Sequence, residues 1–182
     1  MMALNYLIKT IFDLYLMVVI LRVWLQFARA DFYNPFSQFV VRITNPFLKP
    51  LRRIIPGYGG VDWAGIIFAF IVGAVKSILL LHFITGAMIW GLVPIFALLT
   101  VVKQFGELLF WILLIRAVLS WVSQGRSPVE YVMMQLTEPL LAPIRRIIPV
   151  IGGLDLSVLV VFILLNFINI LFATHIPYWN IV

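Results

Sequence analysis

The chain carries one stretch, NPFLKPLRRIIP at residues 45–56, that returns as EPLLAPIRRIIP at residues 138–149. Continuing this alignment without a gap pairs Asp62 with Asp155. Around both copies the order of features is the same: an apolar segment, the basic proline-rich stretch, a Gly-Gly-x-Asp turn and a second apolar segment. The sequence therefore predicts a tandem duplication. Its predicted units are a first repeat over 3–85, a short apolar connection over 86–94 and a second repeat over 95–175.

The composition indicates an integral membrane protein. Hydrophobic residues make up 64% of the 182 residues, charged residues make up 11%, and the mean hydropathy is +1.12. Soluble domains are typically about 45 to 50% apolar and about 25% charged. The absence of cysteine excludes disulfides, thiolate nucleophiles and cysteine-based metal sites. The net charge of +6 comes from basic residues between apolar segments, which favours a role in membrane topology over nucleic-acid binding.

Four apolar stretches are long enough to cross a membrane as helices. At 1.5 Å per residue, about 20 residues span a hydrocarbon core of roughly 30 Å. The predicted spans cover residues 3–27, 61–85, 95–122 and 156–174. The predicted fold class is therefore all-α, with about four transmembrane helices from two parallel tandem repeats. An extra short or re-entrant segment around residues 87–100 stays open as an alternative.

The repeated motif also resembles that of a known family. A proline-rich stretch ending in R-R-x-x-P, followed by a glycine turn and an aspartate, is similar to the repeat of the YggT family of bacterial and plastid membrane proteins. The match covers nearly the whole chain, and two copies resemble the proteobacterial form. No enzymatic activity is established for that family, so the resemblance implies none for this chain. It implies links to osmotic-stress tolerance, cation uptake, cell or plastid division and the assembly of membrane complexes.

Each basic connection is predicted to begin with a short helix. A capping residue followed by proline is typical of a helix start, which places these starts at Pro35 and Pro128. The residue before a proline is pushed out of the α region, so we expect the helices to stop before Pro46 and Pro139.

The repeated stretch itself is amphipathic. Its apolar residues Leu48, Leu51, Ile54 and Ile55 recur at helical spacing, which predicts a segment lying in the membrane interface with its apolar side down. The basic side chains either set topology only or form a docking surface. The docking surface would bind anionic phospholipid, a protein partner or a second copy of the chain. Its candidate residues are Lys49, Arg52, Arg53, Arg145 and Arg146.

An aspartate follows each basic stretch. Asp62 and Asp155 are predicted to cap the next spanning helix, with Asp62 beside Arg52 and Arg53, because exposed amides and the helix dipole favour a carboxylate there. The glycines before them predict a tight turn. These turn residues are Gly59, Gly60, Gly152 and Gly153.

The distribution of lysine and arginine predicts the orientation. Residues 29–60 hold five of them and residues 123–153 hold three, whereas residues 86–94 hold none. Cytoplasmic loops carry the basic excess, so we expect both basic connections in the cytoplasm and both termini outside. The resemblance to the YggT family implies a location in the bacterial inner membrane. Tyr178 and Trp179 in the tail are placed where an aromatic belt would lie.

Ionisable residues within the spans form a second candidate site. A charge in hydrocarbon costs about 2.5 to 3.5 kcal/mol on insertion scales and needs a partner. Asp13 and Lys76 lie at depths that match within about one helical turn, and alignment places Glu107 and Asn169 at the corresponding positions of the second repeat. These four residues are either structural contacts between helices or an ion or proton path.

No stretch of the sequence supports enzyme chemistry, a cofactor or a metal. His82 and His175 are the only histidines, and neither has a second ligand or a nucleophile at a recognised spacing. Two functions of different classes are therefore expected. One is a non-catalytic membrane accessory protein in osmotic or envelope stress, assisting division or complex assembly. The alternative is a small oligomeric cation channel or transporter.

Overall fold

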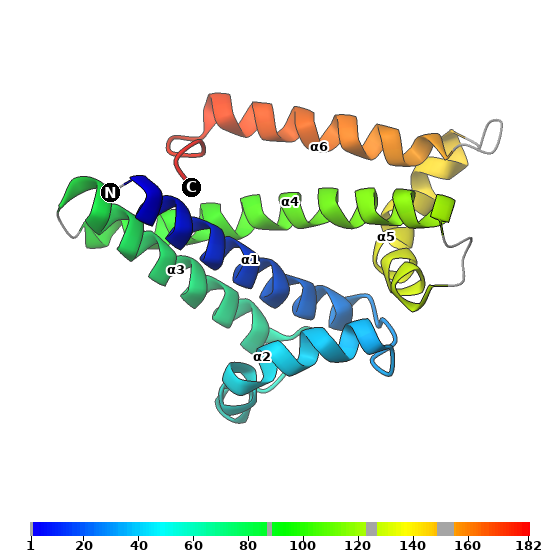
Figure 1. Cartoon of the computed structure of the whole chain (residues 1–182), viewed down its shortest axis with the longest axis horizontal. Helices are drawn as coiled ribbons and strands as arrows, with labels where there is room; N and C mark the ends of the chain where they lie inside the picture. Colours follow the sequence, from blue (N-terminus) through cyan, green and yellow to red (C-terminus); the bar gives the residue numbers. More distant parts are fainter. Residues whose placement is uncertain (1, 87–88, 123–126, 149–154) are drawn as a thin grey trace.

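The computed structural model describes residues 2–86, 89–122, 127–148 and 155–182. These residues form α-helices, one 3-10 turn and an isolated bridge between Tyr58 and Val61, so the predicted all-α class is confirmed. Figure 1 labels the α-helices. Their bounds are α1 Met2–Phe27, α2 Pro35–Ile54, α3 Trp63–Thr85, α4 Val93–Val122, α5 Pro128–Ile147 and α6 Leu156–His175.

Four of these helices, α1, α3, α4 and α6, are long and apolar enough to cross a membrane. Their bounds agree with the predicted spans within about two residues. In the described part of the connection, the 3-10 turn Trp90–Leu92 leads directly into α4 at Val93. The described residues from Ile89 to Thr100 therefore contain no separate re-entrant segment, whereas residues 87–88 lie outside the described ranges.

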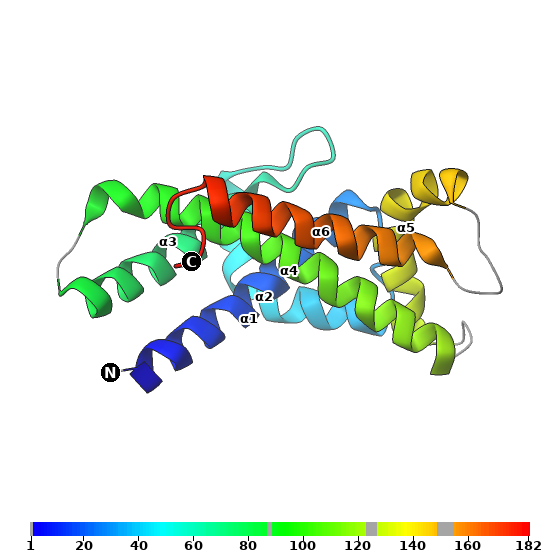
Figure 2. The same cartoon turned by 90° about the horizontal axis from the view of Figure 1, so that it is seen from above.

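The two shorter helices lie together at one end of the bundle. In Figures 1 and 2, α2 and α5 are found at the end of the long helices opposite to the chain termini. Their beginnings are joined by hydrogen bonds. The Asn34 side-chain amide donates to the Pro128 carbonyl at 2.7 Å, and the Asp31 backbone N–H donates to Gln135 Oε1 at 3.0 Å. Both basic connections therefore form one continuous structure.

Helices α2 and α5 begin where the sequence predicts, but they do not stop where it predicts. Each starts with proline at its first turn and continues through two internal prolines, Pro46 and Pro50 in α2 and Pro139 and Pro143 in α5. The expected ends before Pro46 and Pro139 are therefore wrong. All four prolines are exposed. The carbonyls that lose an N–H partner can bend outward on that side, and both ribbons change direction along their length (Figures 1 and 2).

The core lies around α1, which packs against α2, α3 and α4. Fully buried leucines and valines such as Leu16, Val19 and Leu25 fill it. Glycine permits two of the close approaches. A Cβ at Gly65 would lie 2.6 Å from the Val23 side chain of α1, and a Cβ at Gly73 would lie 3.1 Å from the Ala97 carbonyl of α4.

Helix α6 is the least embedded of the four long helices. Only Ser157 and Val161 on it are buried. It contacts α4 and α5, and Figure 1 shows it running beside α4 on the outer side of the bundle. Helix α4 in contrast packs extensively on α3. The second pair of long helices is therefore much looser than the first pair.

Candidate functional site

In the first half of the chain, Arg52 and Asp62 join α2 to the start of α3; we call this pair the first clamp. Arg52 Nη2 lies 2.5 Å from Asp62 Oδ2, and Arg52 Nε donates to Asp62 Oδ1 at 3.3 Å. Asp62 is 3% exposed and also accepts the Gly65 backbone N–H at 3.2 Å, which caps α3 as predicted. Arg52 Nη2 further donates to Gln26 of α1 at 3.4 Å. The clamp therefore fixes three helices.

In the second half, Arg145 and Asp155 make the corresponding contact between α5 and α6. Arg145 Nε donates to Asp155 Oδ2 at 2.9 Å, and Asp155 caps α6 by accepting the Ser157 backbone N–H at 3.1 Å. Glu138 adds a further carboxylate. Its Oε1 lies 2.7 Å from Arg145 Nη1, and its Oε2 lies 3.2 Å from Arg116 Nη2 on α4. We call Arg145, Asp155 and Glu138 the second clamp.

The second clamp changes the acidity of Asp155. Partial burial alone would raise the pKa of this carboxyl group. The hydrogen bonds from Ser157 and the positive charge of Arg145 outweigh burial, so the pKa of Asp155 lies below its ordinary value. Asp155 is therefore ionised in its capping position, where it stabilises the start of α6.

The predicted turn before α3 is present. Gly59 and Gly60 have φ angles of 63° and 80°, and the Val61 N–H donates to the Tyr58 carbonyl at 3.2 Å. Two consecutive positive φ angles are typical of a turn that glycine adopts without strain. The corresponding pair, Gly152 and Gly153, lies outside the described residues.

The paired arginines divide into an inner and an outer set. Arg52 and Arg145 point to the aspartate caps, whereas Arg53 and Arg146 are exposed. On α2, the basic residues Arg42, Lys49 and Arg53 are all exposed. We call these three residues the outer basic row. None of the three, nor Arg146, forms an ion pair within the described part of the chain.

The apolar side of α2 differs from the expectation of a helix lying apolar side down in the interface. Val40, Thr44 and Leu48 are buried in the protein core, so this face packs on the bundle. Ile54, which the sequence grouped with Leu48, is 79% exposed. The helix is bent at its prolines, and a single face cannot be extrapolated through the bend.

Of the intramembrane candidate residues, Asp13 and Lys76 contact each other, whereas Glu107 has a separate contact. Lys76 Nζ on α3 lies 2.6 Å from Asp13 Oδ1 on α1, and the Lys76 side chain is 3% exposed. The depth match in the sequence therefore identified a real ion pair. Glu107 on α4 has an exposed side chain that accepts a hydrogen bond from Gln104 at 3.2 Å. Its neighbourhood differs from that of Asp13, although the two positions correspond in the alignment.

The fourth intramembrane candidate, Asn169, is used by the chain's own tail. Its Oδ1 accepts the Trp179 indole N–H at 2.9 Å, and the Trp179 ring packs edge-on against Phe172 at 4.9 Å between centroids. Trp179 is 4% exposed and therefore packs inside the protein, whereas Tyr178 is 44% exposed. The tail folds back because Lys103 donates to the Trp179 and Val182 carbonyls, at 3.1 and 2.6 Å.

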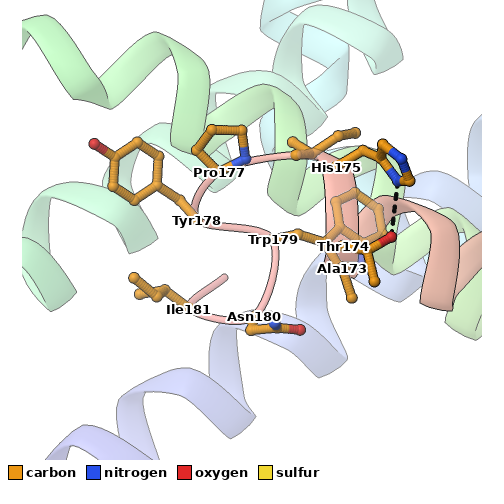
Figure 3. A pocket seen from close by; sticks show the side chains of 9 residues that line it. Ala173, Thr174, His175, Pro177, Tyr178, Trp179, Asn180 and Ile181 are labelled. Carbon is orange, nitrogen blue, oxygen red and sulfur yellow. Dashed lines mark hydrogen bonds between the residues drawn. The ribbon is translucent and has the colours of Figure 1, made fainter.

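This fold-back leaves a pocket inside the tail loop (Figure 3). All nine lining residues come from the single segment 173–181. The side chains of Tyr178 and Trp179 leave the loop in opposite directions, and Thr174 Oγ1 lies 2.7 Å from His175 Nδ1. The pocket is the hollow of one loop, and no residue of the other helices lines it.

Three charged residues in or near the clamps were not predicted as site residues. Arg116 and Glu138 pair with each other, and Arg116 Nη1 donates to Thr137 Oγ1. Arg22, which aligns with Arg116, is 6% exposed and lies 4.7 Å from the centre of the Phe32 ring. An arginine at matching positions near the ends of two spanning segments was the available signal. Within the described ranges, no cluster of histidine, aspartate and glutamate could hold a metal ion.

Comparison with known proteins identifies the family of the chain. The CCB3/YggT family model matches residues 1–83 and 95–176. The chain belongs to the CCB3/YggT family. Among relatives of this CCB3/YggT chain, a Vibrio alginolyticus protein described as an uncharacterized protein in the proC 3′ region is 58% identical over 182 residues, covering 98% of both chains. The uncharacterized protein YggT of Escherichia coli is 49% identical over 170 residues, covering 93% of this chain and 88% of its own.

A more distant relative is an uncharacterized protein of Pseudomonas aeruginosa. It is 42% identical over 170 residues, covering 91% of this chain and 86% of its own. No solved structure matches the chain. The predicted membership of the CCB3/YggT family is confirmed, and nothing in the family or its relatives points to catalysis.

Proposed function

We propose that the protein is a non-catalytic accessory protein of the bacterial cytoplasmic membrane. In this proposal it docks anionic phospholipid or a partner protein through the exposed basic residues of α2 and α5, and it supports tolerance of osmotic or envelope stress. Its basic end faces the cytoplasm and both termini face outside, following the distribution of lysine and arginine.

The observation that carries the proposal is the division of the arginines. Arg52 and Arg145 are neutralised by the aspartate caps. The outer basic row and Arg146 are exposed and have no acid against them among the described residues. A structural role alone would be satisfied by the inner arginines. Each basic residue near an anionic membrane surface contributes about 1 kcal/mol of attraction, so four of them make a useful docking surface.

A second candidate, a small oligomeric cation channel or transporter, is favoured by one observation. Glu107 lies in the middle of α4 with its side chain exposed. A carboxylate facing a membrane is costly without a partner, which a cation or a second copy of the chain would supply. Against a path within one copy, the Asp13–Lys76 pair, the Gln104–Glu107 contact and the Asn169–Trp179 contact are separate interactions.

The experiment replaces Lys49, Arg53 and Arg146 together with glutamine and measures growth of a deletion strain under hyperosmotic conditions. We expect the variant to lose most of its protection. The control exchanges the same residues as Lys49→Arg, Arg53→Lys and Arg146→Lys, which keeps the charge and should keep protection. Protein abundance, and reporters fused after Ile89 and within 131–135, must show unchanged levels and orientation.

The two candidate functions differ in a purified system. The accessory protein should leave a cation gradient across liposomes intact. Cation flux that disappears with Glu107→Gln would overturn the accessory function and support transport. Protection that survives the glutamine variant would exclude Lys49, Arg53 and Arg146 from the docking function.

A further inference from the structure

The buried arginine of the first half lacks the partner that its counterpart has. Arg22 is 6% exposed, and its Nε and Nη1 atoms have no hydrogen-bond acceptor. Its described contact is with the ring of Phe32, whose centre lies 4.7 Å from Arg22 Cζ. Buried guanidinium nitrogens without an acceptor are strongly disfavoured, because their N–H groups and the positive charge lose water.

Arg116, the counterpart of Arg22, has two acceptors on neighbouring residues. It donates to the hydroxyl of Thr137 and lies 3.2 Å from the carboxylate of Glu138. The gap-free alignment that pairs the two basic stretches places Thr44 opposite Thr137 and Asn45 opposite Glu138. The threonine is therefore present in both halves, whereas the carboxylate is replaced by a neutral amide in the first.

The charges around the two arginines differ accordingly. In the second half, Arg116 and Arg145 face the carboxylates of Glu138 and Asp155, two against two. In the first half, Arg22 and Arg52 face the single carboxylate of Asp62. Asp62 already binds Arg52 and the Gly65 N–H. One positive charge is left without an anion.

We propose that this position between α1 and α2 binds an external oxyanion of the phosphate class, which takes the place of the missing carboxylate. The guanidinium of Arg22 is its main ligand, since a planar fork of N–H groups fits phosphate oxygens. Asn45 can add an amide donor where an acid would repel the anion. Arg22 lies five residues before the end of α1, about 7.5 Å along the helix from the end at which α2 begins. This site is separate from the outer basic row and does not rest on the proposed function.

The test uses the full chain, purified in mild detergent and depleted of lipid, and measures its thermal unfolding temperature. Two probes are added separately: inorganic phosphate against chloride at equal ionic strength, and short-chain phosphatidylglycerol against an uncharged short-chain glycolipid. We expect at least one probe to raise the unfolding temperature by on the order of 5 °C. A response to phosphatidylglycerol identifies a lipid headgroup as the source, and a response to inorganic phosphate alone identifies free phosphate.

The variants swap the residues that differ between the two halves at this position. Asn45→Glu supplies the carboxylate internally, so it should raise the unfolding temperature without any probe and abolish the response. Arg22→Gln removes the main ligand and should also abolish the response. Glu138→Asn should lower the unfolding temperature and create a second response in the other half. A wild-type protein that responds to neither probe, or an Arg22→Gln variant that responds like wild type, would overturn the proposal.

Discussion

The two clamps use the same arginine and aspartate positions but are completed differently. The first clamp, Arg52 with Asp62, is deeply buried at the aspartate, whose side chain is 2% exposed. The second clamp has a more exposed aspartate, at 31%, and adds Glu138 as a bridge to α4. The same arginine–aspartate contact therefore occurs in both halves, although the charges around it differ.

The largest difference between the halves should appear at Lys76. Its replacement by methionine leaves the half-buried carboxylate of Asp13 without a partner, and breaking a buried pair costs up to about 3 to 5 kcal/mol. The corresponding change in the second half, Asn169→Leu, removes only a hydrogen bond to Trp179 and should cost about 1 kcal/mol. Thermal unfolding of detergent-solubilised protein measures both.

The double variant Lys76→Met with Asp13→Asn is the control for this pair. It removes both charges and should recover much of the folded yield. Equal recovery from Lys76→Met combined with Glu107→Gln would show that the pairing crosses the halves, contrary to the observed geometry.

The second-largest losses of stability should come from replacing the aspartate caps. Asp62→Asn removes the negative charge that pairs with Arg52 and replaces one of the two accepting oxygens with an amide donor, so we expect a loss of about 2 to 3 kcal/mol. Asp155→Asn should cost about 1 kcal/mol, because Glu138 still pairs with Arg145. Unfolding temperatures of the two variants, measured side by side, test this order. A larger loss for Asp155→Asn would show that Glu138 does not support the second clamp.

The response to acid should also differ between wild type and the Asp155 variant. The folded pKa of Asp155 lies below its unfolded value, so its contribution to stability is complete above the unfolded pKa, about 4. This contribution is lost as the pH falls through the folded pKa. Unfolding temperatures measured from pH 7 down to about pH 3 should therefore converge for wild type and Asp155→Asn. Curves that stay parallel would contradict the coupling.

The smallest effects should come from the feature that both halves share. Pro46 and Pro139 occupy the same position in α2 and α5, and both are exposed. Alanine at either position restores an N–H donor without opening a cavity, so each variant should change stability by less than about 1 kcal/mol. Similar small shifts in the unfolding temperature are expected. A large loss at one position only would reveal a contact that the halves do not share.

The sequence predicted the spanning helices and the aspartate caps because both depend on local properties. A run of apolar residues at 1.5 Å per residue, and an acid before its first turn, act within one segment. The Asp13–Lys76 pair could also be predicted from the sequence, because two opposite charges at one depth in a membrane have few other possible partners. The R-R-x-x-P stretch identified the family for the same reason, as a local pattern.

The rest depended on tertiary structure. The helix ends at Pro46 and Pro139 were wrong because a proline on an exposed helix face bends the chain instead of ending the helix. The burial of Trp179 could not be read from the tail, since it is caused by Lys103 and Asn169 on other helices. The division between inner and outer arginines likewise required knowing which side of α2 faces Asp62.

The shallow burial of α6 has a consequence for how the bundle assembles. In lipid, apolar surfaces gain little by meeting one another, so a spanning helix stays associated through close packing and polar contacts. Helix α6 has such contacts at its two ends: the second clamp beside Asp155, and the Asn169–Trp179 hydrogen bond near its other end. Helix α6 is thus held by polar contacts near its two ends, and lipid acyl chains can solvate its middle. Local unfolding should start in the middle of α6. Each of the two end contacts can break without disturbing the tightly packed pair α1 and α3.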